Sequence, residues 1–149
     1  MSISPIKLSQ REAMLLEAAR AHGFVDEEII HKLRGGNPAP FLEIEEGKYD
    51  FSPLFALYEE NRELLEEAIR EGYAIKYTTF NGIKFILNKR YNLVSPRDYE
   101  AEETAFSGIR LAEKDVAWLR STLSGNWRIV ELERLPKSGE SVIRIEWNG

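Results

Sequence analysis

Residues 52–72 read SPLFALYEENRELLEEAIREG, and this stretch decides how the fold is interpreted. Its apolar residues recur at steps of three and four positions, which predicts one amphipathic helix over residues 53–71. Ser52 precedes a proline at the first helical position, and Gly72 follows the last turn, as is typical of helix ends. The predicted buried stripe consists of Leu54, Leu57, Tyr58, Leu64, Leu65, Ala68 and Ile69.

The opposite side of this predicted helix is strongly acidic, and only Arg62 and Arg70 interrupt it. Like charges four residues apart destabilise a helix slightly, so this side is either a solvated surface or a docking surface for a partner. We call the candidate partner-binding residues the acidic face: Glu59, Glu60, Glu63, Glu66 and Glu67.

The next segment, residues 73–88, is rich in aromatic and β-branched residues on both sides of Asn81-Gly82. Asn-Gly is the preferred pair for a two-residue hairpin turn, so the sequence predicts a β-hairpin. Cations interleaved with aromatic residues can bind phosphates and stack bases, although exposed lysines on strands also prevent aggregation. The candidate anion-binding or nucleic-acid-binding residues are Lys76, Lys84, Lys89, Arg90 and Arg97.

Upstream of the acidic helix, the sequence predicts two shorter helices. Ser9 and Glu12 have capping-box spacing, which predicts a helix over residues 10–21 that ends at Gly23. Asp26 is a natural N-cap for a second helix over residues 27–34. Two short strands are then expected at residues 41–44 and 48–51, with a turn at residues 45–47.

Helix, glycine turn and helix form a helix-turn-helix pattern. Leu8-Ser-Gln-Arg-Glu12 followed by Leu15-Leu16 resembles the start of a LuxR-type helix-turn-helix, and the element order resembles a winged-helix DNA-binding domain. That resemblance implies a third helix in the major groove. The helix at 53–71 carries six glutamates against two arginines on its outer side, which disfavours insertion among phosphates.

The C-terminal third is expected to hold a linker over residues 91–108, a helix over 110–123, and strands over 127–135 and 141–147. The predicted fold class is therefore α+β. A winged-helix-like N-terminal domain spans residues 1–98, and a helix–hairpin subdomain spans 99–149. The two are expected to share one core.

Composition narrows the functional classes. The chain has 149 residues, a net charge of −5 and no cysteine, which excludes disulfides, thiol nucleophiles and cysteine-ligated zinc or iron–sulfur sites. Residues 37–72 carry a net charge of −7 and residues 73–98 carry +4, so an acidic segment adjoins a basic one. With no long apolar run and no signal pattern, a cytoplasmic protein without membrane contact is expected.

No catalytic constellation is recognisable, so we expect no enzyme activity, cofactor or metal. His22 and His31 lie nine residues apart and are interpreted as structural. The carboxylates Glu43, Glu45, Glu46 and Asp50 lack the spacing of a calcium loop. The leading hypothesis is a small regulatory or adaptor protein that contacts another protein or a second copy of itself. The alternative is nucleic-acid binding through residues 73–97.

Overall fold

The computed structural model describes residues 6–148 and has the α+β architecture that the sequence predicts. The chain divides into two compact units, Met1–Lys76 and Tyr77–Gly149. The sequence suggested a boundary at residue 98, which is 22 positions further along. A core shared by the two parts stays a prediction, and each unit is described by itself.

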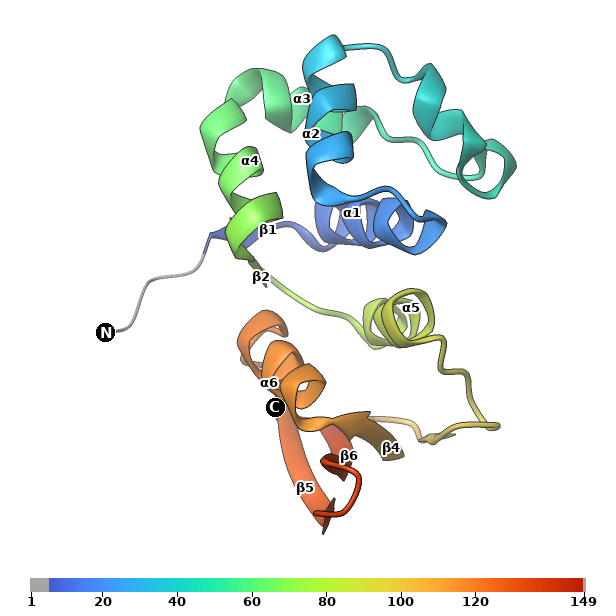
Figure 1. Ribbon diagram of the computed structural model, residues 1–149. Coiled ribbons are helices and arrows are strands. Elements are labelled where there is room, and N and C mark those ends of the chain that lie inside the picture. The colour runs from blue at the N-terminus through green and yellow to red at the C-terminus, as the bar shows by residue number, and fades with distance from the viewer. Residues whose placement is uncertain (1–5, 149) are drawn as a thin grey trace. The chain divides into compact units, whose positions relative to one another are not determined.

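Unit 1 is helical, and its helices run from blue to green in Figure 1. They enclose a core of side chains that are at most 2% exposed, including Leu16, Ile30, Leu54 and Leu65. The elements are β1 (Lys7–Leu8), α1 (Gln10–His22), α2 (Asp26–Gly35), η1 (Ala39–Gly47), α3 (Ser52–Glu60), α4 (Arg62–Glu71) and β2 (Ala74–Ile75).

The ends of α1 confirm their sequence signals. The Glu12 N–H donates to Ser9 Oγ over 3.1 Å, and the Ser9 N–H donates to Glu12 Oε1 over 2.9 Å. Gly23 takes a left-handed φ of 112°, which glycine adopts without strain. At α2 the prediction was wrong by one residue. Val25 is the N-cap, and its N–H donates to Glu28 Oε1.

The two strands expected at residues 41–44 and 48–51 are absent, and η1 covers most of that region. Asn37 Oδ1 accepts the Ala39 N–H over 3.0 Å, which starts a 3₁₀ turn at the prolines instead of a strand. The chain does turn where predicted, because Glu45, Glu46 and Gly47 all have positive φ. The predicted strand pair was therefore wrong, while its connecting turn was right.

The single helix predicted over residues 53–71 is two helices, α3 and α4, separated at Asn61. Asn61 has a non-helical backbone (φ −151°, ψ 76°). Its side chain accepts the Leu64 N–H over 3.3 Å and caps α4, as asparagine commonly does at helix starts. The apolar spacing continues across this break, which explains why the sequence pattern did not reveal it.

The predicted hairpin at residues 73–88 was also wrong. Its first residues form β2, which pairs in parallel with β1, and residues 80–91 form the helix α5 (Phe80–Tyr91). Thr79 Oγ1 accepts the Gly82 N–H over 3.1 Å, so Asn81-Gly82 lies in the first helical turn instead of a β-turn. The winged-helix-like wing is therefore missing from the described fold.

Unit 2 packs helices against one antiparallel sheet with strand order β3-β4-β6-β5. Phe80 of α5 stacks on Phe106 of the sheet at 4.4 Å, and α6 packs against β4 and β6 (Figure 1). The remaining elements are β3 (Glu100–Ala101), β4 (Ala105–Ala112), α6 (Glu113–Thr122), β5 (Trp127–Leu135) and β6 (Glu140–Trp147).

The last two strands confirm their predictions closely, and Ile143 and Ile145 are fully buried on one face. The helix predicted over 110–123 begins only at Glu113, because residues 105–112 form β4. That strand also occupies part of the linker expected at 91–108. Between residues 6 and 148, no helix combines the length and apolarity that crossing a bilayer requires.

Candidate functional site

The acidic face is divided between two helices. Glu59 and Glu60 close α3, while Glu63, Glu66 and Glu67 lie on α4 beyond the break at Asn61. The sequence placed these carboxylates on a single continuous helix, whereas the structure places them on two. Their role in binding a partner stays a prediction.

Glu66 does not belong to the available surface. The Tyr58 hydroxyl donates to its Oε2 over 2.5 Å, and Arg34 and Arg70 pair with the same carboxylate at 3.3 and 3.4 Å. The hydrogen bond from Tyr58 lowers the pKa of Glu66, and the two arginines lower it further. Its side chain is only 16% exposed. Glu66 thus joins α2, α3 and α4, which is a structural role.

The other four carboxylates of the acidic face are exposed. None of them forms an ion pair with any residue from 6 to 148. Other glutamates of unit 1 differ in this respect, since Glu27 pairs with Arg70 at 2.8 Å and Glu28 pairs with Lys32 at 3.2 Å. Negative charge at Glu59, Glu60, Glu63 and Glu67 is therefore not neutralised by a direct contact within the described chain.

The structure does not bring the five candidate anion-binding residues together on a hairpin. Lys76 ends unit 1, and Lys84, Lys89 and Arg90 belong to α5 of unit 2. Arg97 pairs with Asp98 at 2.7 Å, and this hydrogen-bonded pairing raises the Arg97 pKa. The Arg90 guanidinium lies over the Trp118 ring at 3.7 Å, a cation–π contact that holds α5 to α6.

What remains of the basic cluster is one face of α5. Asn81, Lys84, Phe85 and Asn88 lie on one side of α5, because these positions are three and four residues apart. Lys89 follows Phe85 by four residues and lies at the edge of this side. The helix contains no aspartate or glutamate. Lys89 lies 5.7 Å from the centre of the Phe85 ring, and Arg90 lies 5.9 Å from that of Tyr91, so cation–aromatic pairs do form here, on a helix instead of on strands.

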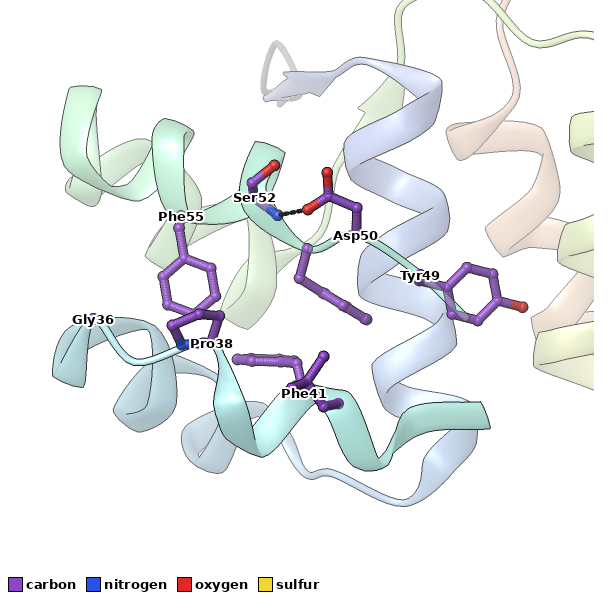
Figure 2. Close-up of a pocket in the computed structure, with 9 residues that line it drawn as sticks. Gly36, Pro38, Phe41, Tyr49, Asp50, Ser52 and Phe55 are labelled. Carbon is purple, nitrogen blue, oxygen red and sulfur yellow. Dashed lines mark hydrogen bonds between the residues drawn. The ribbon is translucent and has the colours of Figure 1, made fainter. Parts of the chain in front are cut away.

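A feature that the sequence reasoning missed is a surface pocket of about 450 Å³ in unit 1, between η1 and the start of α3. Figure 2 shows Phe55 projecting from α3 toward Pro38 and Phe41. Phe41 stacks on Phe51 at 4.8 Å and meets Phe55 edge-on at 5.5 Å. We call this the aromatic pocket; its lining is Gly36, Pro38, Phe41, Leu42, Tyr49, Asp50, Phe51, Ser52 and Phe55.

A second hollow of about 500 Å³ adjoins the aromatic pocket and shares Gly36 and Phe55 with it. This polar hollow leads to Glu59 of the acidic face. Two residues thus line both the aromatic pocket and the polar hollow that contains Glu59. The other residues lining the polar hollow are Leu33, Arg34, Tyr58 and Arg62.

The sequence held one signal for the aromatic pocket, namely four aromatic side chains and three prolines within residues 38–55. The predicted strand pair would have distributed those rings over a sheet. The η1 turns and the start of α3 gather them instead.

Two histidines and the carboxylates in and beside η1 are the other titratable candidates that the sequence offers. His22 and His31 are both exposed, and His22 packs edge-on against Phe24 at 5.0 Å. Asp50 is held by the Ser52 N–H at 2.9 Å, and Glu45 accepts the Tyr49 hydroxyl at the same distance. In the described part of the chain, no three histidines or carboxylates gather in a way that could hold a metal ion.

Comparisons of this chain with protein-family models, with curated proteins and with solved structures found no match.

Proposed function

We propose that this protein is a small cytoplasmic regulatory or adaptor protein without enzyme activity, which binds a basic surface of a partner protein. The binding surface is formed by four residues of the acidic face, Glu59, Glu60, Glu63 and Glu67. The observation that carries the proposal is that these carboxylates are exposed and lack ion pairs among residues 6–148.

Unit 1 as a whole supports this choice of partner. Residues 1–76 contain 15 acidic and 9 basic side chains, whereas residues 77–149 contain 10 acidic and 11 basic ones. A concentration of one sign of charge attracts an oppositely charged partner over about a Debye length, and it raises the association rate more than the final affinity. A basic protein surface is therefore the matching chemistry.

The test compares the full chain with two variants in a pull-down from a cell lysate, followed by size-exclusion chromatography. The first variant replaces the four carboxylates of the face with glutamine. The matched control replaces four exposed glutamates of unit 2 with glutamine: Glu100, Glu103, Glu113 and Glu133. The proposal expects a stoichiometric partner, or a second copy of the chain, with the wild type and the control only. Equal recovery by all three proteins, or recovery of nothing, overturns it.

A second candidate function is nucleic-acid binding through α5, and it is favoured by a helix that carries Lys84 and Lys89 and contains no aspartate or glutamate. The expected affinity of α5 for nucleic acid is low. Two phosphate contacts give a salt slope of about −2, so affinity falls only about tenfold between 50 and 200 mM salt. Specific DNA-binding proteins neutralise several more phosphates, which is why we place protein contact first.

Fluorescence anisotropy tests this second function with a labelled 20-base-pair duplex and a labelled 20-nucleotide single strand at 50 mM salt. Binding that weakens with salt and is lost on Lys84→Ala/Lys89→Ala supports it. The charge-matched control is Lys114→Ala/Lys137→Ala, both exposed in unit 2. The second function is rejected if the chain binds neither nucleic acid, or if the two double variants lose affinity equally.

A further inference from the structure

We infer that the aromatic pocket is the anchor site for the partner: it takes one bulky apolar side chain from a segment that carries lysine or arginine on both sides of that residue. This inference rests on the proposed function, because it places the anchor of the same partner beside the same acidic surface.

The apolar part of the inference follows from what lines the pocket. Phe41 and Phe51 are almost fully buried and form its floor, while Phe55 is half-buried and Leu42 is 58% exposed. An exposed leucine beside an aromatic floor leaves apolar surface in water, and covering it is favourable. Rigid aromatic walls also lose little conformational freedom on binding, as is typical of anchor sites at protein interfaces.

The basic flanks follow from the charges at its edges. The lining of the aromatic pocket contains no lysine or arginine, and its one charged residue is Asp50. On the η1 side, Glu43 and Glu46 are exposed, whereas the charge of Glu45 is paired with Lys48 at 4.0 Å. Toward α4, the polar hollow leads to Glu59. A segment anchored in the pocket therefore meets carboxylates in both directions.

Two arginines line the polar hollow, and their positive charges affect where the basic residues of the partner segment can lie. Arg34 is paired with Glu66 at 3.3 Å, so its charge is largely compensated. Arg62 is exposed and has no ion pair among the described residues. A cationic segment passing Glu59 is repelled by Arg62. Removing that charge should strengthen binding, which a nonspecific hydrophobic contact would not show.

The experiment titrates three synthetic octapeptides into the isotope-labelled full chain and follows backbone amide shifts by NMR. The probe KKSWLSKK combines an apolar centre with basic flanks. KKSSSSKK lacks the apolar centre, and EESWLSEE reverses the charge. The inference expects the first peptide to shift the amides of Leu42 and Phe55, and the other two to bind at least roughly tenfold more weakly.

Variants locate the site. Leu42→Ser should weaken KKSWLSKK by roughly tenfold, whereas Leu132→Ser, which changes a leucine of unit 2 that is 51% exposed, should not. Phe55→Ala should weaken it further, with circular dichroism to confirm that the helices remain. Arg62→Gln should tighten it by about two- to threefold, as expected for one exposed charge.

Several results overturn the inference: equal binding of the three peptides, shifts that avoid Leu42 and Phe55, equal effects of Leu42→Ser and Leu132→Ser, or self-association that is lost on Leu42→Ser. The lysate experiment separates the two proposals. If Leu42→Ser retains a partner that the acidic-face variant loses, the anchor is wrong and the proposed function stands. If the acidic-face variant retains the partner, the proposed function itself fails.

Discussion

The Thr78 N–H donates to Ser124 Oγ over 2.7 Å, and the Ser124 N–H donates back to Thr78 Oγ1 over 3.2 Å. Residues 46 positions apart are thus joined by a reciprocal pair of hydrogen bonds. The Thr78 carbonyl oxygen also accepts from the Trp127 indole nitrogen over 2.8 Å. Since Thr78 is fully buried, these bonds fix the first residues of unit 2 against the turn between α6 and β5.

We expect Ser124→Ala to lower the free energy of unfolding by about 1–3 kcal/mol, because it leaves the buried Thr78 N–H without its acceptor. Urea denaturation followed by circular dichroism measures this. Ser121→Ala is the control: Ser121 is exposed and its hydroxyl bonds only within α6, so its effect should stay within about 0.5 kcal/mol. Equal effects would show that the Thr78 contact is not stabilising.

A buried ion pair gives the second prediction. Glu17 is 1% exposed, and its Oε2 accepts from Arg20 over 2.9 Å and from the Tyr73 hydroxyl over 2.7 Å. Arg20→Met should cost about 3 kcal/mol, because it leaves a buried carboxylate without its cation. In the double variant Glu17→Gln/Arg20→Met the loss should be smaller than the sum of the single losses. Additive losses in urea denaturation would contradict the coupling.

The third prediction concerns a stabilising change. Thr122 on α6 is fully buried, and its hydroxyl oxygen has no hydrogen-bond partner in the described structure. Thr122→Val keeps the branched shape and removes the unpaired polar group, so it should raise stability by up to about 1 kcal/mol. Thr122→Ser keeps the hydroxyl and loses a methyl group, so it should destabilise. A destabilised valine variant would mean that the hydroxyl is satisfied in solution.

The fourth prediction is a pH dependence. The Arg70 hydrogen bond lowers the pKa of Glu27, and the Tyr58 hydrogen bond lowers that of Glu66. A carboxylate whose pKa is lower in the folded than in the unfolded state stabilises the fold above its unfolded pKa. That stabilisation is lost as the pH falls through the folded pKa. The melting temperature should therefore fall between pH 5 and pH 3.

Glu66→Gln should make this pH dependence shallower, because glutamine at position 66 does not titrate. Glu63→Gln is the control on the same helix, since Glu63 is exposed and has no ion pair among residues 6–148. Melting curves at half-unit pH intervals decide the matter. An unchanged slope in the Glu66 variant would assign the acid sensitivity to other carboxylates.

The sequence predicted those elements whose signals are local. The capping box at Ser9, the glycine end at Gly23 and the alternating residues of β6 each depend on neighbours within a few positions. Two of the errors occur at asparagines. Asn61 ended a helix that the apolar pattern continued, and Asn81 lies in the first turn of a helix capped by Thr79, where the pair Asn-Gly suggested a β-turn. Asparagine suits helix starts and turns alike, so packing against distant residues decides between them.

The candidate site shows the same difference between features that depend on neighbouring residues and features that depend on distant ones. The sequence located the acidic face, because charge and spacing are visible in it. It could not show that Glu66 is engaged, since Arg34 contributes from α2, which is 32 positions away. The aromatic residues near the pocket are visible in the sequence, but the pocket itself is not, because it exists only after the η1 turns bring Phe41 toward Phe51 and Phe55.

The parallel pairing of β1 and β2 has a mechanical consequence. The Ala74 N–H donates to the Ile6 carbonyl and the Lys76 N–H donates to the Leu8 carbonyl, at 2.7 and 2.9 Å. A force that pulls the segment before residue 6 away from the segment after residue 76 slides these parallel strands past one another. Both hydrogen bonds then bear the load together instead of opening in turn. Tension along the chain therefore loads the β1–β2 pair in shear, the direction in which paired strands resist separation more strongly. This pair has to break before the tension reaches the helices of unit 1.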